Sequence, residues 1–168
     1  FALWQFDKGG YLQELLHKLK YHRLTGVGID LGAIVGNTLK KENVLQSFDS
    51  ENTMILPVPL HNKKRRSRGF NQAFFIAKGM ADILGFSIIE KGVVERVKNT
   101  KTQTGFSLGK RRENIANAFK LAHPEKLKGK NIIIVDDVFT TGATAFELVT
   151  ELQKASLSKI FIATVAQA

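Results

Sequence analysis

Two adjacent carboxylates and the hydroxyl-rich turn after them are the part of this sequence best suited to chemistry. Asp136 and Asp137 directly follow the apolar run 132–135, and three threonines and Gly142 lie within the next seven residues. Carboxylates accept hydrogen bonds from the hydroxyls of a polyol. Threonine hydroxyls, and backbone N–H groups brought close by a glycine, suit an anion. One short stretch therefore offers both halves of a site for a phosphorylated sugar.

The elements around these residues are predicted to place them at a ligand-binding edge. The apolar run before Asp136 is short and branched, which indicates a strand buried on both faces. The carboxylates then lie at its carboxyl end, where open parallel sheets bind ligands. A helix predicted from Ala143 to Ala155 directs its free N–H groups toward the turn. The alternative is an ordinary strand and capped helix, but an acidic pair left there without solvent or ligand is costly.

The remaining pattern alternates strands with helices and predicts one α/β domain over residues 1–168, with a mostly parallel sheet. Glycines 26, 28 and 32 do not make a dinucleotide fingerprint, because Leu31 occupies the place of the third glycine. Asp30 instead predicts the N-cap of a helix that runs to about Leu39. Further helices are expected at 11–21 and 72–84, and strands at 1–6, 53–58, 118–121 and 159–165, with one or two more in 87–97.

Composition narrows the functional classes. The net charge of +10 favours polyanionic partners, without separating a nucleotide-like substrate from a nucleic acid. The chain has no cysteine, so neither disulfides nor thiolate metal sites are expected in it. No apolar run approaches the ~20 residues that cross a bilayer, so we expect no membrane insertion.

A second candidate anion site follows the strand predicted at 53–58. Pro57, Val58 and Pro59 hold the chain in a defined bend and are expected to end sheet pairing. The basic run 63–68 comes next, and its arginine forks match phosphate oxygens. A solvated charge run is the usual explanation of such a segment. Its position beside a predicted substrate loop favours a binding role, most clearly for Arg68.

The stretch Ile132–Thr144 closely resembles the thirteen-residue phosphoribosyl-pyrophosphate (PRPP) motif of type I phosphoribosyltransferases. The resemblance implies that Asp136 and Asp137 are the catalytic pair, which binds the ribose 2- and 3-hydroxyls and lies near Mg²⁺ held largely through ribose and water. It implies that the 5-phosphate binds the loop that follows. This loop comprises Thr140, Thr141, Gly142, Ala143 and Thr144.

The same resemblance assigns the second site to the pyrophosphate, in a loop that often has a cis peptide in this family. Its residues would be Pro57, Val58, Pro59, Arg65, Arg66 and Arg68. It also implies a flexible loop that closes over the site, with Arg96, Thr100, Gln103 and Arg112. A small hood from the N-terminal segment is expected to contact the acceptor. The implied cofactor is Mg²⁺, and the implied reaction displaces pyrophosphate from C1 of PRPP.

Further segments resemble the ComF/GntX group of phosphoribosyltransferase-like proteins, which is associated with competence for natural transformation and DNA uptake. They are Leu19-Lys20-Tyr21, Pro57-Val58-Pro59-Leu60-His61, Arg68-Gly69-Phe70-Asn71-Gln72-Ala73 and the spaced set Arg96, Thr100, Gln103, Arg112, Asn114 and Phe119. Members of this group commonly begin with a cysteine-rich zinc-binding segment, which these residues lack. The resemblance implies a cytoplasmic protein that works with the DNA-uptake machinery.

Three functions remain open on this basis. The chain is a pentosyltransferase whose acceptor the sequence does not identify, a competence factor that binds single-stranded DNA, or a sensor that binds PRPP without turnover. Clusters of Lys and Arg favour DNA, whereas the lack of a regular array of stacking aromatics counts against it. Members of this fold class often dimerise, so a homodimer is an expectation by analogy.

Overall fold

A computed structural model of the chain describes residues 1–6, 9–100 and 114–168. Its centre is a five-stranded sheet in the order β1-β7-β6-β2-β3, and every neighbouring pair is parallel. The strands are β1 (Ala2–Gln5), β2 (Thr53–Pro57), β3 (Ser87–Ile88), β6 (Asn131–Phe139) and β7 (Lys159–Gln167). The mostly parallel α/β architecture is confirmed. The N-terminal segment adds an edge strand to this sheet through β1.

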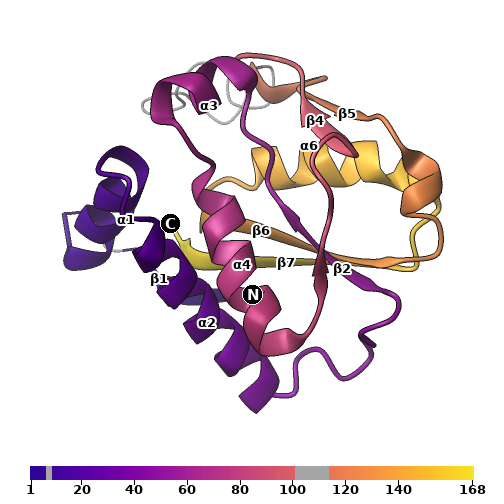
Figure 1. The fold of residues 1–168 in the computed structure, drawn as a ribbon, viewed down its shortest axis with the longest axis horizontal. Helices are drawn as coiled ribbons and strands as arrows, with labels where there is room; N and C mark the ends of the chain where they lie inside the picture. Colours follow the sequence, from indigo (N-terminus) through magenta and orange to yellow (C-terminus); the bar gives the residue numbers. More distant parts are fainter. Residues whose placement is uncertain (7–8, 101–113) are drawn as a thin grey trace.

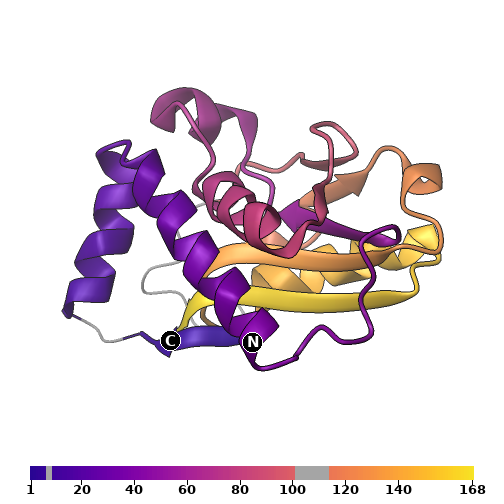
Figure 2. The ribbon, with the colours of Figure 1, turned by 60° about the horizontal axis from the view of Figure 1, so that its bottom comes forward.

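Helices cover both faces of the sheet (Figures 1 and 2). They are α1 (Tyr11–Tyr21), α2 (Thr25–Lys41), α3 (Asn62–Arg68), α4 (Gln72–Leu84) and α6 (Ala143–Leu152), with 3₁₀ turns η1 (Pro124–Lys126) and η2 (Gln153–Ala155). A small antiparallel pair, β4 (Val94–Arg96) and β5 (Phe119–Leu121), lies on the α6 side. No helix among the described residues has both the length and the apolar character to cross a bilayer.

Strand β6 divides the core into two parts because its side chains alternate between the faces. Ile132 and Ile134 pack in the cluster that includes α6, β4 and β5. Ile133 and Val135 pack in the other cluster, with α1, α2 and α4. Buried on both faces, this strand has the near-continuous apolar run expected of a central parallel strand.

Helix α2 begins earlier than predicted, and the expected N-cap at Asp30 is wrong. Asp30 lies inside the helix and is exposed. The glycines that weaken the helical pattern serve the packing between α2 and α4. A Cβ atom on Gly32 would lie 2.0 Å from the Ile76 carbonyl oxygen, and one on Gly79 would lie 1.9 Å from that of Ile29. The two backbones therefore touch, and only glycine fits at these contacts.

The chain after β2 differs from the sequence-based expectations in three respects. The basic run after the two prolines forms the short helix α3, with His61 as its N-cap and Gly69 in a left-handed conformation at its end. Pairing does not stop at the first proline, because the Val58 N–H donates to the Val135 carbonyl over 2.9 Å. In the part of the chain that the structure describes, no peptide bond is cis, whereas the family resemblance implied one in this loop.

Candidate functional site

The two adjacent carboxylates face opposite sides of the sheet. Strand β6 continues through Phe139, so Asp136 and Asp137 lie within the ladder near its carboxyl end, and Asp136 pairs with Thr164 of β7. Asp136 follows Ile134 in the alternation and faces α6, whereas Asp137 follows Val135 and faces α1 and α4. The Asp137 N–H donates to the Asp136 carboxylate over 2.9 Å. The acidic pair therefore serves two different environments.

Asp136 lines a small cavity with the predicted phosphate loop. The cavity has a volume of about 40 Å³, which leaves room for one small group. Thr140, Gly142, Ala143 and Thr144 line it, and Val58 approaches from the end of β2. The structure thus brings the loop and Asp136 together, whereas the sequence predicted that both acids would lie in the same site.

The loop leaves donors without protein partners, as an anion site requires. Gly142 has φ of +74° and is the N-cap of α6, where no side chain accepts from the first N–H groups. The Thr141 hydroxyl is buried and has no hydrogen-bond partner among the described residues. A Cβ on Gly142 would lie 2.5 Å from the Phe146 ring, so the tight turn needs glycine. Free amides at a helix start and an unpaired buried hydroxyl favour a phosphate.

Asp137 is held in a network on the other face of the sheet. Its side chain is only 6% exposed, and Lys20 from α1 forms an ion pair with its Oδ2. Gln72 at the start of α4 donates to its Oδ1 over 3.4 Å, and Arg68 donates to Gln72. The Arg68 guanidinium lies 5.6 Å from the centre of the Tyr21 ring. These contacts join α1, α3 and α4 to the sheet at the carboxyl end of β6.

The two carboxyls differ in acidity for physical reasons. Burial and the neighbouring Asp137 charge raise the pKa of Asp136 well above its ordinary value. Burial also acts to raise the pKa of Asp137, but Lys20 and hydrogen bonds outweigh it and leave that pKa lowered. Burial acts to lower the pKa of Lys20, but the charge of Asp137, its hydrogen bond and the charge of Asp136 together outweigh burial and leave that pKa raised. A cation or a hydroxyl donor in the cavity would therefore stabilise the ionised form of Asp136 more than that of Asp137.

Arg96 of the predicted flexible loop is close enough to Asp136 to interact with its charge, and Lys64 is in turn close to Arg96. Burial lowers the pKa of Lys64, and the nearby charges of Arg96 and Arg68 lower it further. Burial also lowers the pKa of Arg96, which the charge of Asp136 partly offsets. The Arg96 Nη2 donates to Thr100 over 2.6 Å, while its buried Nε has no partner among the described residues. Lys64 was not among the residues that the sequence assigned to the site.

The three arginines of the predicted pyrophosphate site lie on α3 and project into different surroundings. Arg68 joins the network around Asp137, Arg66 points to solvent, and Arg65 lines a separate, larger cavity with Pro57 and Pro59. Gln103 and Arg112 of the predicted flexible loop lie outside the described residues. Lys20 and Gln72 belong to motifs noted in the sequence but were not assigned to the site. The sequence signal for these two residues was indirect: a buried carboxylate such as Asp137 needs hydrogen-bonding or charged partners.

Two carboxylates are too few to bind a hard cation on their own, so oxygens of a bound ligand would have to complete its coordination. No group of three His, Cys, Asp or Glu side chains gathers into a metal site within residues 1–6, 9–100 and 114–168. Mg²⁺ keeps several waters and uses one or two carboxylates together with substrate oxygens. Asp136 fits that requirement because it faces the cavity and has no cationic side chain bonded to it in the described structure.

Comparisons with known proteins identify a family and three relatives. Residues 71–168 match the family model described as a phosphoribosyl transferase domain. Competence protein F of Haemophilus influenzae is 36% identical over 115 residues, which cover 68% of this chain and 50% of that protein. DNA utilization protein YhgH of Salmonella typhimurium is 33% identical, covering 82% and 59% respectively. Competence protein ComFC of Bacillus subtilis is 29% identical, covering 58% and 37%. The chain thus spans about half the length of these relatives.

Proposed function

The chain belongs to the phosphoribosyl transferase domain family, and from this premise we propose that it binds PRPP with Mg²⁺ and serves in DNA uptake or DNA utilisation. The observation that carries the proposal is the buried, unpartnered Thr141 hydroxyl beside the uncapped first turn of α6. A 5-phosphate would satisfy both. The names of the relatives support the biological context.

Each part of the site has a role in this proposal. The α6 amides and the threonine hydroxyls hold the 5-phosphate, while the Asp136 carboxylate accepts a hydrogen bond from a ribose hydroxyl. Lys64 and Arg96 supply positive charge for the pyrophosphate end, where it stabilises a departing anion. Asp136 would hold Mg²⁺, which would supply positive charge to the pyrophosphate oxygens. Asp137 acts through Lys20 and Gln72, and its contact with ribose stays a prediction.

Calorimetric titration of the protein with Mg–PRPP tests this function. We expect saturable binding that Asp136→Asn and Thr144→Val each weaken by roughly 10- to 100-fold, the value of one hydrogen bond to a charged group. Asp82→Asn removes an exposed carboxylate of α4, and Thr150→Val makes the same change on the outer side of α6, so both should bind as the parent does. Absence of binding by the parent protein, or equal loss in the control variants, contradicts the assignment.

The pH dependence gives the same titration a second readout. The Asp136 pKa is raised in the free protein, so part of this carboxyl carries a proton in mild acid. A ligand that needs the ionised form must displace that proton, and affinity for Mg–PRPP should therefore rise with pH and then level off.

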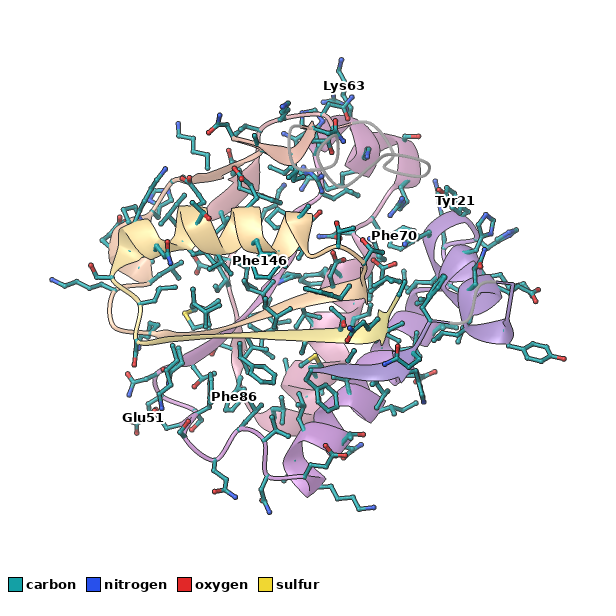
Figure 3. All side chains as sticks on the ribbon, turned by 180° about the vertical axis from the view of Figure 1, so that it is seen from behind. Tyr21, Glu51, Lys63, Phe70, Phe86 and Phe146 are labelled. Atoms are coloured by element: carbon teal, nitrogen blue, oxygen red, sulfur yellow. The ribbon has the colours of Figure 1, made fainter. Side chains whose placement is uncertain are left out.

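A second candidate function, the binding of single-stranded nucleic acid, rests on a separate observation. Lys63 and Arg66 point outward from α3, and Figure 3 shows Lys63 projecting from the rim of the molecule. Such cations track the phosphates of single-stranded nucleic acid. We expect Lys63→Gln/Arg66→Gln to reduce the slope of log K against log salt for oligo-dT by about 1.4, because each phosphate contact contributes ~0.7. The control variant Lys40→Gln/Lys41→Gln has the same net charge as this double variant, and it should leave the slope as it is in the parent.

A further inference from the structure

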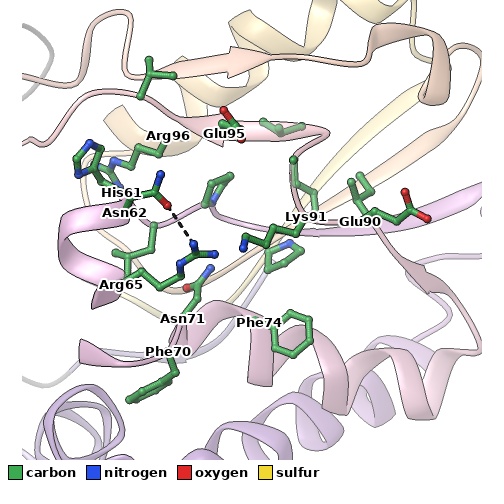
Figure 4. A pocket seen from close by; sticks show the side chains of 18 of the residues that line it. His61, Asn62, Arg65, Phe70, Asn71, Phe74, Glu90, Lys91, Glu95 and Arg96 are labelled. Carbon is green, nitrogen blue, oxygen red and sulfur yellow. Dashed lines mark hydrogen bonds between the residues drawn. The ribbon is translucent and has the colours of Figure 1, made fainter. Parts of the chain in front are cut away.

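A second, larger cavity lies beside the candidate phosphosugar site, not in it. It has a volume of about 690 Å³ and opens between the α3–α4 corner and the segment 89–97 (Figure 4). The extended chain 57–59 separates it from the small cavity. Val58 lines the small cavity, whereas Pro57 and Pro59 line the large one, because successive side chains point to opposite sides. The two cavities share this wall.

Aromatic rings make one side of the large cavity. Phe70, Phe74 and Phe75 all line it and pack edge to face, with centroids 5.8 Å apart for Phe70 and Phe75 and 5.5 Å for Phe74 and Phe75. Phe74 nevertheless remains 42% exposed, so its ring is accessible to a ligand. Leu56, Ile89 and Val94 add aliphatic surface. A mostly apolar cavity of this size with a few polar groups is typical of a small-molecule site.

Two cations meet across the cavity, and a third, Arg96, which was assigned above to the pyrophosphate end, also lines it. Figure 4 shows Arg65 and Lys91 reaching from different elements toward the same space. Arg65 donates to the Asn62 side chain over 3.2 Å, which leaves most of its five N–H donors available. Two positive charges that converge in this way repel each other unless an anion lies between them.

The acidic residues of the lining do not neutralise this pair. Glu90 turns outward to Lys126, with 2.7 Å between Oε2 and Nζ, and its carboxylate points away from Arg65 and Lys91 (Figure 4). Glu95 is exposed and also points away from them. The interior of the cavity is therefore apolar and aromatic, with a positive charge where the two cations converge.

We propose that this cavity is a second binding site and that its ligand is an aromatic monoanion, a one- or two-ring planar system with one carboxylate-like group. The ring packs against Phe74 and Phe75, and the anionic group lies between Arg65 and Lys91. Offset or edge-to-face contact with the exposed Phe74 ring provides the apolar part of binding. The guanidinium fork of Arg65 and the Lys91 ammonium bind the anionic oxygens.

The test uses indole-3-acetate and its neutral analogue indole-3-acetamide, followed by NMR titration of the ¹⁵N-labelled protein. We expect shifts in amides of the α4 start and of residues 89–97, with a Kd of about 1 mM or tighter, as suits ligands of this size. The carboxylate should bind at least tenfold more tightly than the amide. Binding of neither probe, or equal binding of both, overturns the proposal.

Matched variants locate the site. Lys91→Gln should remove most of the preference for the carboxylate, while Lys128→Gln, on the exposed turn after η1, should leave it unchanged. Phe74→Ser should weaken both probes, whereas Phe146→Ser removes a comparably exposed phenylalanine of α6 and should weaken neither. Asp136→Asn should not affect either probe. If Asp136→Asn abolishes binding, the probe occupies the phosphosugar site and the second site does not exist, whatever the outcome with Mg–PRPP.

Discussion

Replacing Gly32 with alanine should strongly destabilise the fold, although alanine is the better helix former. The added Cβ would lie 2.0 Å from the Ile76 carbonyl oxygen and 2.8 Å from its carbon, both backbone atoms that cannot rotate away. Helices α2 and α4 would have to separate, and with them the cluster that includes Leu31, Val35 and Met80. We expect a loss of at least about 3 kcal/mol, at the upper end of overpacking costs. Urea unfolding followed by circular dichroism measures it.

Gly26→Ala is the matched control for this substitution. It makes the same chemical change in the same helix, but nothing lies within 4 Å of the added atom. Alanine is favoured over glycine in a helix by up to about 1 kcal/mol, less near the end of the helix, so this variant should be slightly more stable than the parent. Changes of opposite sign in the free energy of unfolding of the two variants would establish that the contact between helices, not helix propensity, determines the cost of Gly32→Ala. Equal effects would refute the close approach of α2 to α4.

Removing the ammonium of Lys20 should have the second large effect. Lys20→Met keeps most of the side-chain volume but leaves the Asp137 carboxylate buried without its ion partner. Breaking a buried pair in this way costs 3–5 kcal/mol, and we expect about 3 because the Lys20 side chain stays 27% exposed. For a chain of this length that corresponds to a fall in Tm of roughly 6–12 °C at neutral pH.

The loss should depend on pH in a defined direction. The folded-state pKa of Asp137 is lowered, so its contribution to stability is present above the unfolded pKa and disappears as pH falls through the folded value. The difference between parent and Lys20→Met should therefore narrow in acid, where thermal melts at several pH values detect it. The double variant Lys20→Met/Asp137→Asn should recover part of the loss at neutral pH. A constant difference at all pH values would mean that Lys20 contributes packing alone.

Local patterns in the sequence were sufficient to predict most of the helices and strands. Apolar periodicity predicted α1 and α4 with their observed limits, and Asn71 and Gly85 do cap α4. The branched run before Asp136 predicted β6 as a central strand, and Gly142 marked the start of α6. These features depend on neighbours within a few residues, which is why the sequence shows them.

Features decided by distant contacts were not predictable in the same way. The start of α2 at Thr25 was missed because its glycines disfavour a helix locally and are explained only by α4. Helix α3 was missed because five cations in seven residues resemble a solvated loop, and its caps, His61 and Gly69, give the local signal. Charge alone could not show which face of α3 contacts the body of the protein.

The separation of Asp136 from Asp137 could, in contrast, have been predicted. Two adjacent residues of a strand must point to opposite faces, so only one of them can line a given cavity unless the strand ends between them. The sequence placed the strand end before Asp136, whereas the ladder continues to Phe139. The pairing of Asp137 with Lys20 needed the fold, because 117 residues separate the two along the chain.

The wall of chain at 57–59 makes the volumes of its two cavities interdependent. It is tied at Val58, whose N–H donates to Val135 and whose carbonyl accepts from Asn71 over 3.0 Å. Any displacement of this partition toward one side enlarges one compartment at the expense of the other. Ligands that each require their own compartment at full size would then oppose one another. Thermodynamic reciprocity requires the antagonism to be equal in both directions.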